Sequence, residues 1–231
     1  MDQQLLFLKN IFNETNIQLM NATYTSLIQE SQQAFQAINW QTPSLWISVG
    51  TVVLSPLYWN VVARNEYKNK TLTKLFGTKE LACWFFSASV FILGLYRDYR
   101  FTVAIKDQPH GPEAFPFLAL PAVVAFGYII STIGSMFVFF SMKGLGIHGT
   151  YLGDYFGILK TERVTGFPFN VVEHPMYYGS TMCFLGTAIW YASPIGVLLS
   201  AWVLIVYLIA GVGFEEEFTN KIYSNAQKKT A

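Results

Sequence analysis

The sequence predicts an all-α membrane protein, a polytopic helix bundle that ends in a helical hairpin. Of its 231 residues, 52% are hydrophobic and only 13% are charged, whereas roughly a quarter of the residues in a soluble domain are charged. The sequence also contains four long uncharged runs, and a crossing helix needs about 20 apolar residues to span a bilayer core of ~30 Å. No run alternates at period two over the length of a strand, so we do not expect a membrane β-barrel.

A polar N-terminal region precedes the first run and covers residues 1–43. It lacks the basic-then-apolar pattern of a signal peptide, and its scattered apolar residues suit either an interfacial helix or a mobile tail. The membrane domain is expected over residues 44–223, followed by a C-terminal tail over residues 224–231.

The first three uncharged runs have the lengths of membrane helices. They comprise 20, 16 and 28 residues and cover Ser44–Ala63, Leu81–Tyr96 and Phe115–Met142. The second run is short and is bounded by charges at Glu80 and Arg97. Each run is therefore predicted to cross the bilayer once.

The fourth run, Gly179–Phe214, is too long for one crossing. Its 36 residues would extend ~54 Å as a single helix. A turn at Pro194 would return the chain to its own side. That topology places eleven Lys and Arg residues on the face of the C-terminus and four on the other, so the C-terminus is predicted to be cytosolic. A single crossing, which gives an even distribution, stays the alternative.

Polar motifs flank the fourth run at both ends. Pro175 suits the first turn of a helix and places His174 at the N-cap, where backbone amides favour an anionic group. His174 is equally suited to a simple cap facing the headgroups. Glu215–Glu217 stand at a helix C-terminus, where acids oppose the helix dipole. They form either a solvated stop or a partner for a cationic ligand.

The loop between the third and fourth runs, residues 143–178, is rich in glycine and aromatic residues and contains Asp154. It has no Gly-x-Gly-x-x-Gly after a strand, so no Rossmann domain is expected. Thr132-Ile133-Gly134, within the third run, offers small residues for either helix packing or ligand contact. The net charge of +1 gives no reason to expect a nucleic-acid partner, and no spacing of Cys and His predicts a metal site.

Five sequence blocks occur in an order that resembles a known family. They are Pro56–Arg64, Gly149–Leu159, Arg163–Asn170, Pro175–Thr181 and Glu215–Thr219. Together they resemble the phospholipid methyltransferase family, membrane enzymes that methylate phosphatidylethanolamine toward phosphatidylcholine. The resemblance covers about residues 45–223. The His-Pro-x-Tyr-x-Gly and paired-Glu pattern is also similar to the wider superfamily that includes isoprenylcysteine carboxyl methyltransferases.

The resemblance implies S-adenosylmethionine as the methyl donor. The family binds it through a Gly-x-Gly in the third membrane segment, which corresponds to Thr132, Ile133 and Gly134 with Thr in place of the first Gly, and through a Glu pair, which corresponds to Glu215 and Glu216. We also expect His174 and Tyr177 to contact the donor. The candidates for the catalytic base, left unranked, are Glu215, Glu216, His174 and Asp154.

The implied chemistry agrees with these residue types, because carboxylates stabilise a sulfonium donor and an ammonium product. The implied substrate is an ethanolamine phospholipid in the bilayer, carrying no, one or two methyl groups. The implied location is the endoplasmic reticulum membrane, with a mitochondrial membrane as the alternative. Methylation of a prenylcysteine carboxylate and a non-catalytic scaffold are the competing functions, and the oligomeric state is open.

Overall fold

The computed structural model describes residues 14–161 and 164–230, which are helical and contain no strand. Residues 1–13 of the expected N-terminal region and Arg163 of the third block lie outside the described residues. The long helices are α2 (Glu14–Gln36), α3 (Pro43–Asn69), α5 (Lys79–Lys106), α6 (Pro121–Thr150), α7 (Pro175–Trp190), α8 (Pro194–Ala210) and α9 (Glu216–Thr230). The short elements are α4 (Thr71–Phe76), η1 (Pro116–Ala119), η2 (Gly153–Phe156) and the π-helical turn η3 (Gly211–Glu215).

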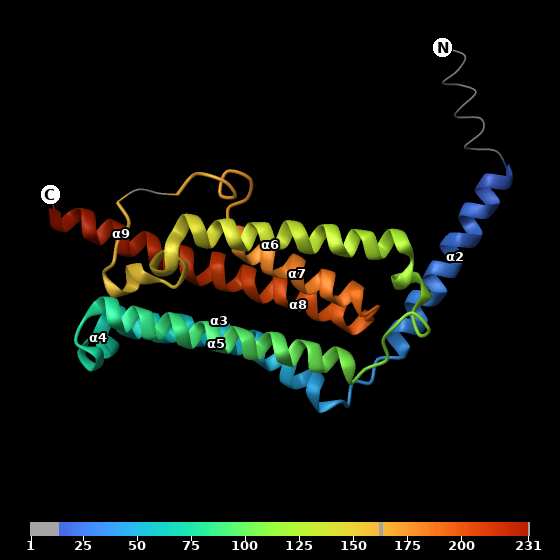
Figure 1. The fold of residues 1–231 in the computed structure, drawn as a ribbon, viewed down its shortest axis with the longest axis horizontal. Helices are drawn as coiled ribbons and strands as arrows, with labels where there is room; N and C mark the ends of the chain where they lie inside the picture. Colours follow the sequence, from blue (N-terminus) through green and yellow to red (C-terminus); the bar gives the residue numbers. More distant parts are fainter. Residues whose placement is uncertain (1–13, 162–163, 231) are drawn as a thin grey trace, which may run out of the picture.

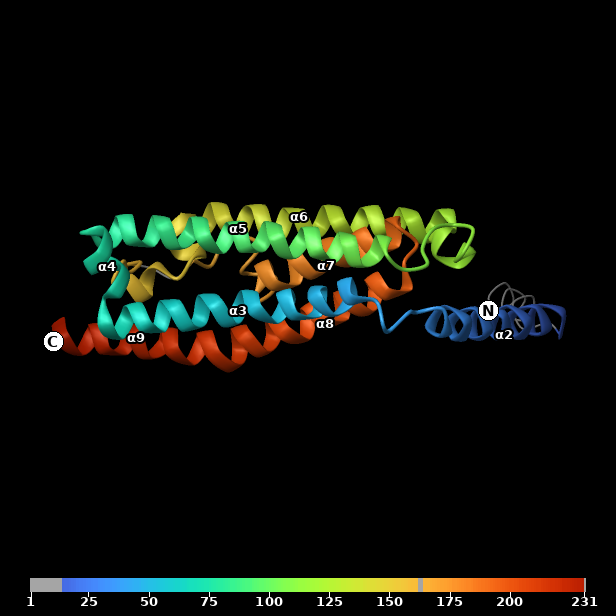
Figure 2. The ribbon, with the colours of Figure 1, turned by 90° about the horizontal axis from the view of Figure 1, so that it is seen from below.

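Five helices form an elongated bundle. In Figure 1, α3, α5, α6, α7 and α8 run along its long axis, α2 leaves the bundle at one end and α9 extends from the other. Figure 2 shows α5 and α6 on one side and α3, α8 and α9 on the other. Four described segments are long and apolar enough to cross a membrane: Pro43–Asn69, Lys79–Lys106, Pro121–Phe156 and Pro194–Ala226. The expected all-α polytopic bundle is confirmed.

The fourth uncharged run is a hairpin. α7 ends at Trp190, and α8 begins at Pro194 with the side chain of Ser193 accepting a hydrogen bond from the Gly196 amide at 3.2 Å. Three residues form the turn between them, and α7 and α8 pack against each other. The single-crossing alternative is therefore wrong, because the turn at residues 191–193 folds α8 back against α7.

The second membrane helix is longer than its uncharged run. We expected it to end at Tyr96, yet α5 continues to Lys106 and includes Arg97 in its interior. Arg97 pairs with Asp98 at 2.7 Å, and its guanidinium stacks on the rings of Phe184 and Tyr207 at 5.0 and 5.6 Å from their centroids. These contacts replace water around the charge, so the helix does not have to end there.

The third membrane helix also differs from its uncharged run in both bounds. α6 begins at Pro121 and continues past Met142 to Thr150. A break at Gly146, whose φ of +66° suits glycine, separates its last turn from the rest. This last turn leads the chain directly into η2.

Glycines allow α6 and α7 to approach each other closely. A Cβ placed on Gly134 would lie 2.5 Å from the Gly179 carbonyl oxygen, and one on Gly186 would lie 2.7 Å from that of Gly127. Both pairs therefore lie where the two backbones touch. For Thr132-Ile133-Gly134, helix packing and ligand contact were both possible. The position of Gly134 agrees with helix packing.

We expect Gly186→Ala to destabilise the bundle by about 1–3 kcal/mol, because the added methyl group meets the α6 backbone. Thermal unfolding in detergent micelles measures this effect. The matched control is Gly50→Ala on α3, where nothing lies within 4 Å of the added Cβ and alanine favours the helix. Equal unfolding temperatures for the two variants would contradict the packing interpretation.

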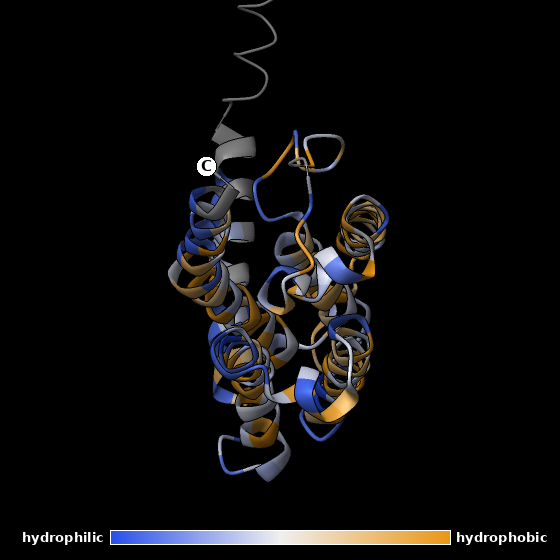
Figure 3. Cartoon of the chain, turned by 90° about the vertical axis from the view of Figure 1, so that its left-hand side faces the viewer, coloured by the Kyte–Doolittle hydropathy of each residue, from blue (hydrophilic) through white to orange (hydrophobic). Residues whose placement is uncertain are grey.

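The α9 end of the bundle is polar. Figure 3, which views the molecule from the α9 end, shows hydrophilic segments at the near end and hydrophobic helices behind them. α9 continues to Thr230, so the expected domain boundary after residue 223 falls inside a helix. At the other end, α2 occupies part of the polar N-terminal region, and its contact with a membrane surface stays a prediction.

Candidate active site

Glu215 is held by hydrogen bonds from two other helices. Its Oε1 accepts hydrogen bonds from Trp59 Nε1 at 2.5 Å and from Asn60 Nδ2 at 3.2 Å, both on α3. Its Oε2 accepts a hydrogen bond from the hydroxyl of Tyr177 on α7. The first and last turns of the hairpin therefore meet at this carboxylate, as the expected topology required.

The π-helical turn η3 sets the direction of Glu215. Such turns are rare and occur often at functional sites. Gly211 begins η3, and a Cβ there would lie 2.5 Å from Cε2 of Tyr177, so only glycine lets the tyrosine ring pack against this turn. Arg64 of α3 donates from Nη2 to the Phe214 carbonyl oxygen at 2.7 Å and stacks over the Phe218 ring at 4.8 Å. These contacts fix η3 against α3.

The two members of the Glu pair occupy different environments. The Glu215 carboxylate is held between α3 and α7, whereas the Glu216 side chain is 55% exposed. Glu216 Oε2 lies 4.0 Å from His174 Nε2, and His174 is at the N-cap of α7, as expected from Pro175. The pair therefore places one carboxylate between two helices and one on an exposed side chain, beside an imidazole.

A cavity of about 740 Å³ lies beside Glu215. Its size is in the range of small-molecule sites, about 300–1,000 Å³. α3, α5, α6, α7 and the end of α8 contribute to its wall, which is largely apolar. Trp59, His174, Tyr177 and Glu215 form a polar group on this wall. The cavity continues along α5 to Arg97 and Thr102, so its polar groups lie at separate places along one continuous space.

The carboxylate of Glu215 is not balanced by a protein cation. Its three hydrogen-bond donors are neutral groups, and in the part of the chain that the structure describes no Lys, Arg or His lies within ion-pair distance of it. A buried carboxylate is costly without a positive partner. The arrangement therefore fits a cationic ligand. Within the described ranges, no three His, Cys, Asp or Glu side chains come together as a metal site requires.

Other expected site residues lie away from the cavity. Thr132, Ile133 and Gly134 are absent from its wall, and the Thr132 hydroxyl donates to the Tyr128 carbonyl of its own helix. Asp154 in η2 is also absent from the wall and bonds with the Thr219 side chain on α9. Roles of these four residues in donor binding or catalysis stay predictions that the geometry of the cavity does not support.

Sequence reasoning missed several residues of the site. Trp59 and Asn60 lie within the first block, yet we assigned them no role. The available signal was the succession of a tryptophan and an asparagine within a membrane helix. Their polar groups need hydrogen-bond partners when they are buried, so they indicate a polar site. Arg97 was taken as the end of a helix, although an arginine next to an aspartate is also a pattern of a functional intramembrane pair.

Comparison with known proteins decides the family. The profile described as "Phospholipid methyltransferase" matches residues 122–226. Phosphatidyl-N-methylethanolamine N-methyltransferase of Neurospora crassa is 46% identical over 198 residues, which cover 85% of this chain and 90% of that protein. The chain belongs to the phospholipid methyltransferase family. The expected resemblance is thereby confirmed.

Two further relatives in the phospholipid methyltransferase family are named for different acceptor lipids. Phosphatidylethanolamine N-methyltransferase of Homo sapiens is 45% identical over 181 residues, 78% of this chain and 88% of that protein. Phosphatidyl-N-methylethanolamine N-methyltransferase of Saccharomyces cerevisiae is 41% identical over 197 residues, 85% and 93% of the two chains. No solved structure matches the chain. The matched profile includes both halves of the site, His174 and Tyr177 as well as Glu215 and Glu216.

Proposed function

We propose that this phospholipid methyltransferase transfers methyl groups from S-adenosylmethionine to the amine of ethanolamine phospholipids in the cavity beside Glu215. The observation that carries the proposal is the Glu215 carboxylate, which lies on the cavity wall, is held by neutral donors and has no protein cation within ion-pair distance. The relatives are named for action on phosphatidylethanolamine and on its monomethyl derivative at similar identity. The unmethylated, monomethyl and dimethyl lipids are therefore all candidate acceptors.

The residues present fit the donor. S-adenosylmethionine supplies a methyl group on a positively charged sulfonium, which the amine attacks. Glu215 offers a fixed carboxylate whose orientation is set by Trp59, Asn60 and Tyr177. A carboxylate that is already oriented stabilises positive charge without further reorganisation. His174, on the cavity wall, is suited to the polar parts of the donor, and Glu216, which is absent from the wall, lies beside it.

The acceptor amine must lose a proton, and positions around the cavity favour one of the candidate bases. His174 lies on the cavity wall, with Nε2 4.0 Å from Glu216 Oε2, so its imidazole can face an amine in the cavity, as a general base must. Asp154 is absent from the wall. We therefore assign proton acceptance to His174, with Glu216 orienting it, and charge stabilisation to Glu215.

The proposed orientation places the α9 end of the bundle in the cytosol. The α3–α4–α5 connection at this end carries Arg64, Lys68, Lys70, Lys74 and Lys79, and basic residues favour the cytosolic side. Cytosolic S-adenosylmethionine then reaches Glu216 and His174 directly. The proposed location is the endoplasmic reticulum membrane, with a mitochondrial membrane as the alternative. Protease digestion of a C-terminal tag in sealed microsomes tests the orientation, and a protected tag would contradict it.

Methyl transfer is measured with the purified protein in lipid vesicles and methyl-labelled S-adenosylmethionine. Phosphatidylethanolamine and its mono- and dimethyl derivatives are supplied separately, and label is expected in each lipid product. The Glu215→Gln/Glu216→Gln double variant provides the background. Labelling of a prenylcysteine analogue but of none of the three lipids would overturn the proposal.

A further inference from the structure

Arg97 is a charged residue within an apolar helix. The proposed active-site chemistry gives it no role. Its side chain is only 11% exposed, although it lies in α5, a candidate membrane span. Charges in such segments are costly and mark functional positions. Arg97 lies on the wall of the same cavity as Glu215.

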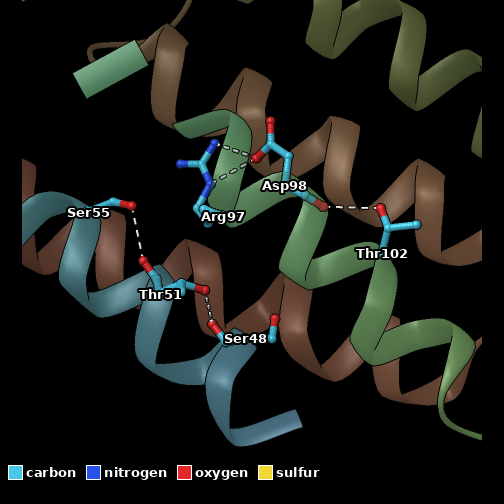
Figure 4. Close-up of polar contacts among 6 residues, drawn as sticks. All are labelled: Ser48, Thr51, Ser55, Arg97, Asp98 and Thr102. Atoms are coloured by element: carbon cyan, nitrogen blue, oxygen red, sulfur yellow. Dashed lines mark hydrogen bonds and ion pairs between the residues drawn. The ribbon is translucent and has the colours of Figure 1, made fainter. Parts of the chain in front are cut away.

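The guanidinium of Arg97 is held in place, but one of its three nitrogens donates no hydrogen bond to the described residues. Its Nε and Nη2 donate to the same oxygen of Asp98, at 2.9 and 2.7 Å. Among the residues that the structure describes, its third nitrogen, Nη1, has no hydrogen bond, and Figure 4 shows it without a contact to the other five residues drawn. Stacking on Phe184 and Tyr207 holds the group in place. The arginine is thus pre-oriented, with donor capacity left for a ligand.

Hydroxyl groups surround this part of the cavity. Thr102 on α5 and Ser55 on α3 both lie on its wall. Figure 4 shows the two helices facing each other, with Ser48, Thr51 and Ser55 on α3 opposite the Arg97–Asp98 pair. The hydroxyls of Thr51, Ser55 and Thr102 donate to carbonyl oxygens of their own helices, which leaves their oxygens as acceptors. The buried Ser48 hydroxyl has no hydrogen-bond partner among the described residues. The surroundings therefore add polarity but no second cation.

The cavity extends to the bilayer-facing surface between α5 and α6. Its wall includes Phe91 and Leu95 of α5, each 54% exposed, and Phe139 of α6, which is 63% exposed. These apolar side chains belong at once to the cavity and to the outer surface of apolar helices. A lipid with its acyl chains in the bilayer can therefore reach Arg97 from the side.

We propose that Arg97 binds the phosphate of the phospholipid substrate, so that the lipid lies in the cavity with its amine toward Glu215. The charge pattern suits a zwitterionic headgroup, because the wall carries the guanidinium of Arg97, paired with Asp98, at one place and the carboxylates of Glu173 and Glu215 at another. Guanidinium groups suit the planar recognition of phosphate oxygens. This proposal rests on the proposed function and adds the residue that recognises the acceptor.

The test compares two acceptors in the wild-type protein and in Arg97→Gln. One acceptor is phosphatidylethanolamine, and the other is a diacylglycerol ether of ethanolamine, which keeps the amine and the chains but lacks the phosphate. We expect wild-type kcat/KM to favour the phosphate-containing lipid and Arg97→Gln to reduce that preference about 10- to 100-fold, as expected for a lost charged hydrogen bond. The KM for S-adenosylmethionine should stay unchanged.

The matched control is Arg100→Gln. Arg100 carries the same charge on the same helix but is absent from the cavity wall, so its substitution should preserve the wild-type preference. If the phosphate-free lipid is not methylated at a measurable rate, its inhibition constant against phosphatidylethanolamine is compared in its place. Arg97→Lys, which keeps the charge but not the planar fork, serves if Arg97→Gln does not fold, and its expected preference is intermediate.

Two results would overturn the proposal. Equal losses on both lipids would show that Arg97 only supports the bundle through Asp98. A raised KM for S-adenosylmethionine with an unchanged lipid preference would assign the guanidinium to the carboxylate of the donor. Absence of labelling in the wild-type protein would instead contradict the proposed function, so the two failures are distinguishable.

Discussion

Replacing Glu215 with glutamine is expected to lower kcat/KM for methyl transfer about 100- to 1,000-fold, the cost of removing one oriented electrostatic group from an active site. The amide keeps the shape of the side chain and still accepts a hydrogen bond from Trp59 Nε1, the partner of Oε1 in the wild type. The negative charge is lost while the packing is retained. Methyl transfer to phosphatidylethanolamine in vesicles measures the effect.

A binding measurement separates loss of charge from loss of fold. S-adenosylmethionine carries a sulfonium, whereas its product S-adenosylhomocysteine carries a neutral thioether of nearly the same shape. If Glu215 faces the sulfonium, Glu215→Gln weakens binding of the donor relative to the product about 10-fold or more. Titration of both compounds into the purified variant gives this ratio.

The control for this variant is Glu217→Gln. Glu217 is exposed and stands two residues further along the chain, so its substitution removes the same charge from the same helix end without touching the cavity wall. We expect wild-type activity and an unchanged binding ratio. Equal effects of the two substitutions would show that the loss of activity follows from the net charge of the helix end. That result would contradict the role given to Glu215.

Gly211→Ala is expected to displace the Tyr177 ring and so to disturb the site around Glu215. The added Cβ would lie 2.5 Å from Cε2 and 3.0 Å from Cδ2 of Tyr177, so the ring must move. The hydrogen bond from Tyr177 to Glu215 is then lost or weakened. We expect destabilisation of about 1–3 kcal/mol from overpacking and a fall in activity of about 10-fold or more, because the carboxylate loses one of its orienting donors.

A neighbouring glycine provides a matched control for this substitution. Gly213 lies in the same π-helical turn, and nothing lies within 4 Å of a Cβ placed there. Gly213→Ala should therefore leave both the unfolding temperature and methyl transfer near the wild-type values. Tyr177→Phe, which removes only the hydroxyl, should reproduce the activity loss of Gly211→Ala with a smaller loss of stability. Retained activity in both Gly211→Ala and Tyr177→Phe would argue against orientation of Glu215 by Tyr177.

The positions of the membrane helices were largely predictable because they depend on composition along one segment at a time. The uncharged runs locate α3, α5, α6 and the α7–α8 hairpin, and Pro194 locates the turn almost to the residue. The bounds were less predictable. α5 continues through Arg97 because Asp98 and two aromatic rings from other helices stabilise the charge, and such partners are not visible in the run itself.

The candidate site was partly predictable, because some of its residues stand in motifs within one local segment. Glu215, His174 and Tyr177 stand in short motifs beside the ends of one run, so a hairpin alone brings them together. Trp59, which holds Glu215 from α3, is 156 residues distant in the chain. No periodicity or spacing connects two residues at that separation. Only the packing of α3 against α8 does so.

The amino-acid sequence alone established the membrane character, the family resemblance and the two polar ends of the fourth run, because each depends on local composition or on a contiguous motif. It favoured the hairpin over a single crossing. The tertiary structure decided which groups act together. It directed Glu215 inward and Glu216 outward through the π-helical turn, kept Thr132 and Asp154 off the cavity wall and placed Arg97 on it. These outcomes depend on how helices rotate and pack against one another, and that is fixed by contacts between distant segments rather than by any one of them.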